Sequence, residues 1–172
     1  MLKRIFSLAD KVFGGKVVYA HCDIPCGIYD PHTAQLSAHT VIRMDALIEK
    51  MPKIGPSPSN DEFRKYIHDL TRYTDVKEEH AEKIKSEVRI LWGDYFKDDH
   101  AKQFPELEGL VLQALRLGSK VKQEVDPKSA QELLETINKI AEIFWKTKGI
   151  ETKRVKVTFW PTDSDLVIPI LN

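Results

Sequence analysis

The longest regular pattern in the chain is a set of nine positions between residues 63 and 91, which recur at alternating spacings of four and three. Seven of the nine are apolar, and a polar pair interrupts them near the middle. This spacing places one stripe along a helix and is typical of the seam of a helical bundle. The positions are Phe63, Ile67, Leu70, Thr74, Lys77, Ala81, Ile84, Val88 and Leu91. The pattern predicts a long helix near 61–97.

Three further amphipathic stretches predict the rest of the bundle. Asp30 and Pro31 form an N-cap followed by proline at the first helical position, and Asp126 and Pro127 repeat that arrangement. The expected helices span 31–51, 105–123 and 127–148. Four amphipathic helices with mostly short connections form an up-down antiparallel four-helix bundle, so we expect an all-α fold.

The segments outside these helices have a different character. Residues 52–60 form a linker rich in proline and serine, and Asn60 is the expected N-cap of the long helix. Gly149 is a natural stop for the last helix. Apolar and polar residues then alternate within 150–172, which indicates a β-hairpin or an extended tail.

The charge balance excludes several partners. Lys plus Arg and Asp plus Glu both number 26, so the chain is neutral and carries no signature of binding to nucleic acid or an acidic membrane. No apolar run is long enough to span a bilayer. Two cysteines are too few for a disulfide framework. The length fits one domain.

Residues 1–20 are interpreted as a leader that is removed on maturation. Asp10 and Lys11 interrupt what would be the apolar core of a secretory signal, so we expect a cytoplasmic protein. An organelle-targeting peptide and a simple N-terminal helix of the fold are the alternatives. The chain then divides into the leader, a domain over 21–149 and an extension over 150–172.

The segment His21–Pro31, with the sequence HCDIPCGIYDP, contains both cysteines of the chain. One imidazole and two thiols fall within six residues, and these groups are ligands for soft and borderline transition metals. A zinc finger is excluded because it needs four ligands in two separated pairs. The simplest alternative is a loop with two ordinary thiols and a surface histidine.

The string HCDIPCGIYDP resembles the metal hook of nickel superoxide dismutases. Three more segments resemble that family in the same order: LWGDYF (91–96), FPEL (104–107) and KIAEIFWKTKG (139–149). The resemblance implies cleavage after Ala20 by a maturation protease, which makes His21 the first residue. The amine and imidazole of His21, the amide of Cys22, and the thiolates of Cys22 and Cys26 would then bind one nickel ion per subunit.

The resemblance implies an enzyme that converts superoxide to oxygen and hydrogen peroxide. Nickel with water or carboxylate ligands is too hard to oxidise for this reaction, whereas thiolates and a deprotonated amide donate charge strongly. Asp23 and Tyr29 match family positions that line the approach to the metal. The family assembles as a hollow hexamer, so a homo-hexamer is expected.

Two positions depart from the family pattern. A glutamate and an arginine hold the axial imidazole in the best-known members, and Ser37 and His80 occupy the corresponding positions here. Such partners orient a metal-bound imidazole, so their replacement affects the axial bond. Two other functions stay open: a nickel or copper carrier without turnover, and a helical interaction module whose cysteines are incidental.

Overall fold

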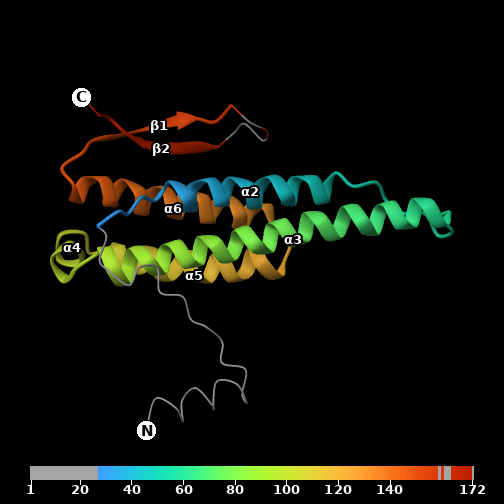
Figure 1. Ribbon diagram of the computed structural model, residues 1–172, viewed down its shortest axis with the longest axis horizontal. Coiled ribbons are helices and arrows are strands. Elements are labelled where there is room, and N and C mark those ends of the chain that lie inside the picture. Colours follow the sequence, from blue (N-terminus) through green and yellow to red (C-terminus); the bar gives the residue numbers. More distant parts are fainter. Residues whose placement is uncertain (1–26, 159, 161–163, 172) are drawn as a thin grey trace, which may run out of the picture.

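The computed structural model describes residues 27–158, 160 and 164–171, which form a helical bundle with a small β-hairpin (Figure 1). The elements are α2 (His32–Glu49), α3 (Asn60–Ile90), the π-helical turn η1 (Leu91–Tyr95), α4 (Asp98–Gln103), α5 (Leu107–Gln123), α6 (Pro127–Thr147), β1 (Thr152–Lys156) and β2 (Asp165–Pro169). Helices α2, α3, α5 and α6 run up and down in turn, and each packs against two of the others. The predicted four-helix bundle and hairpin are confirmed.

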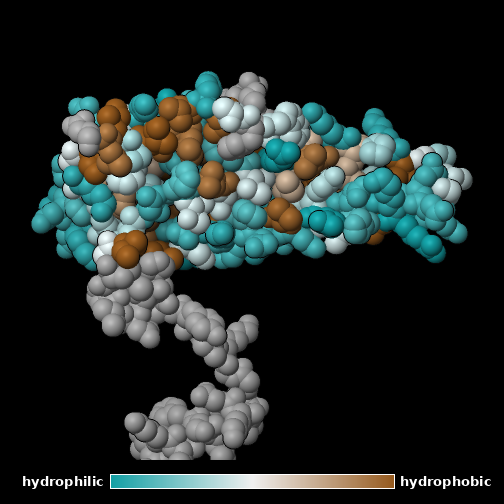
Figure 2. All heavy atoms as spheres, turned by 45° about the horizontal axis from the view of Figure 1, so that its top comes forward, coloured by the Kyte–Doolittle hydropathy of each residue, from teal (hydrophilic) through white to brown (hydrophobic). Residues whose placement is uncertain are grey.

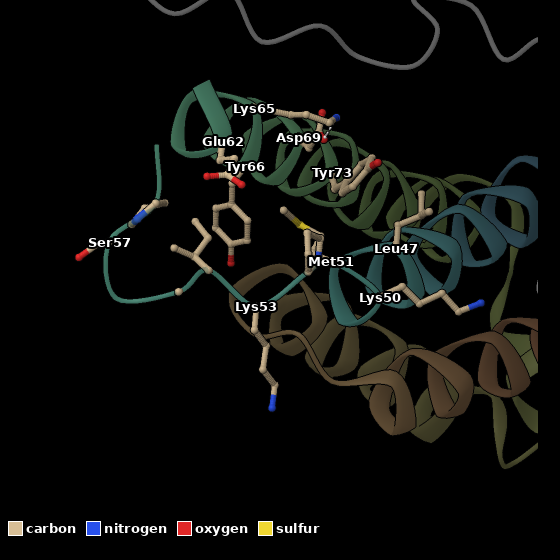
Figure 3. A pocket seen from close by; sticks show the side chains of 14 residues that line it. Leu47, Lys50, Met51, Lys53, Ser57, Glu62, Lys65, Tyr66, Asp69 and Tyr73 are labelled. Carbon is tan, nitrogen blue, oxygen red and sulfur yellow. Dashed lines mark hydrogen bonds and ion pairs between the residues drawn. The ribbon is translucent and has the colours of Figure 1, made fainter. Parts of the chain in front are cut away.

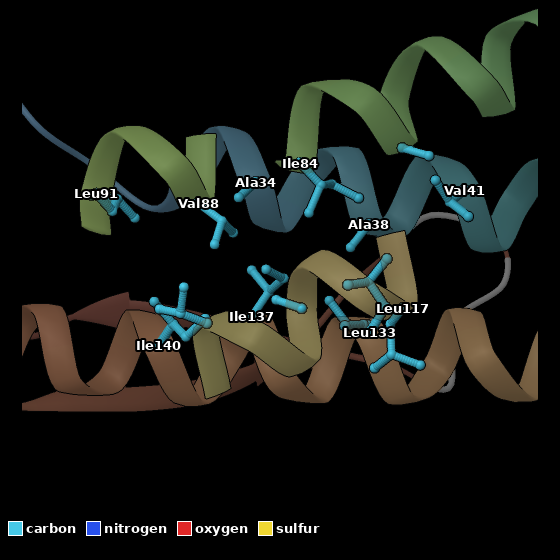
Figure 4. Close-up of a cluster of buried hydrophobic side chains, with 14 of the residues drawn as sticks. Ala34, Ala38, Val41, Ile84, Val88, Leu91, Leu117, Leu133, Ile137 and Ile140 are labelled. Carbon is cyan, nitrogen blue, oxygen red and sulfur yellow. The ribbon is translucent and has the colours of Figure 1, made fainter. Parts of the chain in front are cut away.

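The core is built from one apolar stripe on each long helix. Figure 4 shows stripes from α2, α3, α5 and α6 meeting along the bundle axis. Helix α2 contributes the small residues Ala34 and Ala38, which let its backbone approach the others. Helix α3 contributes Ile84 and Val88, two of the predicted seam positions. No helix within the described ranges is long and apolar enough to cross a membrane.

The predicted polar interruption of the α3 seam is a buried ion pair. Lys77 is 2% exposed and its Nζ lies 3.5 Å from Oδ1 of Asp45, which is fully buried on α2. The same Nζ donates a 2.6 Å hydrogen bond to the carbonyl of Glu124. Burial raises the pKa of Asp45, because a carboxylate removed from water is less stable in its charged form. Lys77 therefore joins three segments of the bundle.

The starts of α3 and α6 are fixed by side-chain caps. The prediction that Asn60 caps α3 is wrong: Ser59 is the N-cap, its hydroxyl accepts from the amide of Glu62, and the Glu62 carboxylate accepts from the amide of Ser59. This reciprocal pair is a capping box. The cap at Asp126 is confirmed, because its carboxylate accepts from the amide of Ser129.

The C-terminal end of the long helix differs from the prediction of one element over 61–97. Helix α3 ends at Ile90, and the π turn follows, closed by a 2.8 Å bond from the amide of Phe96 to the carbonyl of Leu91. The short helix α4 was not predicted. Its six residues carry no buried side chain, so no apolar stripe announces it.

The last helix stops at Gly149, as predicted. Gly149 has a φ of 69°, its amide donates to the carbonyl of Lys146, and the amide of Ile150 donates to the carbonyl of Trp145. These two bonds form a Schellman motif, which favours glycine at the left-handed position. The chain then turns back into the antiparallel hairpin of β1 and β2, which lies along α2 and α6 (Figure 1). Figure 2 shows apolar side chains gathered over this region.

The far end of α2 and the start of α3 extend beyond α5 and α6 (Figure 1). We call residues 47–73 the arm. Helix α3 has no buried residue before Lys77, and Phe63 and Ile67 are 50% and 44% exposed. Figure 3 shows Met51, Tyr66 and other arm side chains around a pocket of about 620 Å³. The pocket lies at the opposite end of α2 from residue 27.

Candidate metal centre

The predicted nickel ligands His21, Cys22 and Cys26 lie outside the described residues, as does Asp23. Among the residues that the structure describes, no group of three or more His, Cys, Asp or Glu side chains could hold a metal ion. The structure therefore describes residues 27–31, which follow the predicted hook in sequence, and the side chains around them.

The chain enters the bundle through a turn and a helix cap. Gly27, directly after Cys26, has a φ of 70°, a conformation that favours glycine. The helix begins at His32 with Pro31 at the cap position, one residue later than predicted. The carboxylate of Asp30 still accepts a 2.7 Å hydrogen bond from the amide of His32. This bond fixes the direction in which the chain leaves α2 toward the hook.

Tyr29 anchors this entry segment to the bundle. Its half-buried ring lies with its centroid 5.5 Å from that of Tyr95, the last residue of the π turn. The hydroxyl of Tyr95 is 2.6 Å from Oγ1 of Thr147, at the end of α6. The ring of Tyr95 also contacts Phe96 (5.2 Å), His100 (5.7 Å) and Phe144 (4.6 Å). We call these six residues the aromatic end of the bundle.

The ammonium group of Lys148 lies over the aromatic end. The Nζ of Lys148 is 5.3 Å from the ring centroid of Tyr95 and 5.0 Å from that of Phe144. An ammonium over an aromatic face is held by the negative face of the ring. Lys148 therefore places a positive charge beside Tyr95, against which Tyr29 packs.

The two positions that depart from the family pattern lie on α2 and α3. Ser37 is buried. His80 is half-buried, and its Nδ1 donates a 2.9 Å hydrogen bond to the carbonyl of Val76. This bond places the proton of a neutral ring on Nδ1, which leaves Nε2 as a hydrogen-bond acceptor. Their role beside His21 stays a prediction.

Most residues of the aromatic end have no role that could be predicted from the sequence. Tyr95 belongs to the segment LWGDYF, while Phe144, Thr147 and Lys148 belong to KIAEIFWKTKG. Each segment was singled out only by its resemblance, and the structure shows that the two meet. Their density of aromatic residues is the signal that could have indicated a shared cluster.

The family described as nickel-containing superoxide dismutase matches residues 16–148, which include the predicted hook and all the long helices. The chain belongs to this family. A native nickel superoxide dismutase structure aligns with a TM-score of 0.62 and 38% identity, over 74% of this chain and 99% of that one.

Two curated relatives agree. "Superoxide dismutase [Ni]" of Streptomyces seoulensis is 40% identical over 142 residues, which is 82% of this chain and 98% of the relative. The protein of the same description from Streptomyces coelicolor is 43% identical over 148 residues, which is 86% and 98%. Family membership confirms the predicted enzyme class and nickel cofactor, and it decides against a metal carrier or an interaction module.

Proposed function

We propose that this chain converts superoxide to oxygen and hydrogen peroxide at a nickel ion held by His21, Cys22 and Cys26. Two thiolates and an imidazole fit nickel, because soft donors and nitrogen suit this metal better than carboxylates do. Bound nickel would supply the one-electron cycling of the reaction. The observation that supports the proposal is the entry segment: the bond from the amide of His32 to the carboxylate of Asp30 and the packing of Tyr29 hold residues 29–32, which follow the hook in sequence, at one end of the bundle.

The free amine of His21 requires cleavage after Ala20. In the uncleaved chain the nitrogen of His21 is an amide, which is a poor ligand unless it loses its proton. Cleavage by a maturation protease converts it to an amine and removes the peptide that would crowd the turn. Residues 1–20 then act as a propeptide, 21–149 as the catalytic domain and 150–172 as an extension.

Tyr29 and Asp23 are proposed to line the approach to the metal. The ring of Tyr29 packs in a tilted arrangement against Tyr95, which is itself hydrogen-bonded to Thr147. A ring held in this way can limit access and order water beside the hook. Lys148 adds a positive charge that favours arrival of the superoxide anion.

His80 is proposed to orient the imidazole of His21. In its neutral form Nε2 of His80 can accept a hydrogen bond from the ring N–H of a metal-bound histidine. Ser37 is buried on α2 and can offer a hydroxyl in the place of the family's glutamate.

A homo-hexamer is proposed for the mature protein. The support in this chain is the arm, where Phe63 and Ile67 expose apolar side chains on the same seam that is buried farther along α3. Apolar residues exposed at a bundle seam favour contact between copies. Sedimentation of the mature chain measures the number of subunits, and a monomer at micromolar concentration would contradict this part of the proposal.

The full proposal is tested with two forms of the protein, residues 1–172 and residues 21–172, both supplied with nickel. We expect nickel content and superoxide decay to be much higher in the shorter form. Cys22→Ser and Cys26→Ser should each abolish turnover while the helical signal is unchanged. Tyr66→Phe, in the arm, is the matched control for Tyr29→Phe. Equal activity per nickel in the uncleaved chain would exclude the free amine as a ligand.

A further inference from the structure

The β-hairpin lies outside the part of the chain that matches the family, which ends at residue 148. Its inner face is nevertheless integrated into the bundle. Val167, in the middle of β2, is 2% exposed, and Val157 after β1 is also buried. Successive residues of a strand point to opposite faces, so Leu166 and Ile168 face away from the helices. The hairpin is therefore packed on the helices by one face only.

A stripe of polar residues on α2 bonds to the hairpin. Gln35, His39 and Arg43 are spaced four residues apart and so share one helix face. Nε2 of Gln35 donates to the carbonyl of Val167 at 3.2 Å. Nδ1 of His39 shares a 3.2 Å hydrogen bond with the hydroxyl of Ser164, and a guanidinium nitrogen of Arg43 donates to the carbonyl of Trp160 at 3.0 Å. The three bonds follow the hairpin along α2.

A second polar stripe on α6 bonds to the same hairpin. Nδ2 of Asn138 donates to the carbonyl of Asp165 at 3.0 Å. Arg154 of β1 donates two hydrogen bonds to Glu135, at 2.6 and 3.0 Å, and one to Glu142 at 2.7 Å. Hydrogen bonds to these carboxylates raise the pKa of the Arg154 guanidinium. The hairpin is thus bonded to α2 and α6 together.

These helix faces are suited to the hairpin. Gln35 and Asn138 are almost completely buried, and a buried amide without a hydrogen-bond partner is destabilising. Backbone carbonyls of β2 accept from the NH2 groups of both side chains, whereas their amide oxygens have no partner among the described residues. Gln35 also lies one helical turn after Pro31, to whose carbonyl its amide donates at 3.2 Å. The bonded stripe on α2 therefore begins next to the segment that leads to the hook.

We propose that the hairpin is a strap that positions the hook. It holds the first turns of α2 against α6, and α6 carries Phe144 and Thr147 of the aromatic end. Loosening the strap frees the start of α2 and with it residues 27–31, without removing any predicted metal ligand. Nickel should then dissociate faster. This inference rests on the proposed function only for its effect on nickel, because the holding of α2 is a property of the bundle alone.

The test compares two substitutions at neighbouring residues of β2 in the mature chain. Val167→Asp buries a charge against the helices and should release the hairpin, whereas Ile168→Asp places the same charge on the outer face. Hydrogen exchange of the amides in 28–36 is measured without metal, and nickel dissociation is measured with it. We expect Val167→Asp to accelerate both at least tenfold, with exchange in α5 unchanged, and Ile168→Asp to leave both within twofold of wild type.

The proposal is overturned if Val167→Asp exposes the hairpin amides to exchange while 28–36 stay as protected as in wild type. Should that variant fail to fold, Gln35→Leu combined with Asn138→Leu removes both donors and retains the volume of the side chains. Hydrogen exchange of the amides in 28–36 is then measured in this double variant, with the same acceleration expected and the same result overturning the proposal. Failure of the wild-type mature chain to bind nickel would count against the proposed function, whereas the exchange result bears only on the strap.

Discussion

The two halves of α3 have the same spacing of seam residues and opposite surroundings. From Lys77 onward the seam is buried, whereas in the arm Phe63 and Ile67 are exposed. The difference comes from the lengths of the neighbours. Helix α3 has 31 residues and α5 has 17, so at 1.5 Å per residue about 20 Å of α3 extends beyond its partner. A seam pattern identifies which face can be buried, and the neighbouring elements determine how much of it is.

The boundary between the two halves is Lys77, and its removal should give the largest effect. Lys77→Met leaves Asp45 buried without its cation, and breaking a buried pair in this way costs about 3–5 kcal/mol of unfolding free energy. Urea denaturation of the metal-free protein measures the loss. Lys77→Met combined with Asp45→Leu removes both charges and should recover most of it. A single variant as stable as wild type would show that the pair does not anchor the buried half.

The stability lost in Lys77→Met should also depend on pH. Burial already raises the pKa of Asp45, and loss of Lys77 should raise it further. A raised pKa in the folded state means that the charged carboxylate opposes folding above that pKa. This destabilisation becomes smaller as the pH falls through the raised pKa toward the ordinary pKa of an aspartate. The deficit of Lys77→Met should therefore be largest at pH 7 and smaller near pH 5, and a deficit that grows on acidification would contradict this account.

Replacing one seam isoleucine by alanine in each half of α3 should show directly how much each half contributes to stability. Ile84→Ala removes a fully buried side chain and should cost about 2–5 kcal/mol of unfolding free energy. Ile67→Ala in the arm should change it by about 0.5 kcal/mol or less, because surface substitutions away from special contacts have small effects. Both are measured by thermal and urea unfolding of monomeric protein. A large loss for Ile67→Ala would show that the arm is already covered.

A smaller effect is expected where α3 passes into the π turn. Tyr95→Phe removes the hydroxyl that bonds Thr147, and a hydrogen bond of this kind contributes about 0.5–1.5 kcal/mol. Thr147 keeps its bond to the carbonyl of Phe144, which limits the loss. The unfolding free energy of Tyr95→Phe is compared with that of Tyr66→Phe in the arm. Equal values would show that the hydroxyl does not tie the π turn to α6.

The smallest effect should be local and confined to the arm. Ser59→Ala removes the cap of α3, so the arm amides should exchange faster while those of residues 81–91 are unchanged. Hydrogen bonds from Ser59 lower the pKa of Glu62, so the stabilisation by the capping box is present above the ordinary glutamate pKa and is lost as the pH falls through the lowered one. Faster exchange in 81–91 would mean that the arm and the core unfold together.

Much of the fold could be predicted because apolar spacing and caps are local signals. The four long helices, the cap at Asp126 and the stop at Gly149 all depend on residues close in sequence. The cap at Ser59 was missed because Ser59 and Asn60 are both good caps, and only the Glu62 carboxylate distinguishes them. The break at Leu91 was missed because the apolar stripe continues to the first residue of the π turn, and the glycine in that turn, Gly93, comes two residues after the break.

The metal site is predicted mainly from one unusual string, and its ligands lie outside the described residues. Thiols and an imidazole in HCDIPCGIYDP are suitable metal ligands, and the resemblance of the whole string to the nickel hook decides against a loop with two ordinary thiols. The contact of Tyr29 with Tyr95 joins residues 66 positions apart, and no local pattern reports such a pairing. The polar stripes on α2 and α6 were unpredictable for the same reason, since Gln35 and Asn138 bond to backbone atoms of a distant hairpin.

The glycine in a left-handed conformation that ends α6 determines where a different C-terminal segment can be attached. Because the carbonyls of Trp145 and Lys146 are already bonded within the Schellman motif, α6 is complete at Ile150 and needs nothing further to close its last turn. A segment of another length or composition can start at this point without leaving helical carbonyls unbonded. The junction is therefore a natural site for grafting, where evolution or protein engineering can attach a new C-terminal module, provided that the module supplies an acceptor for the buried amide of Asn138.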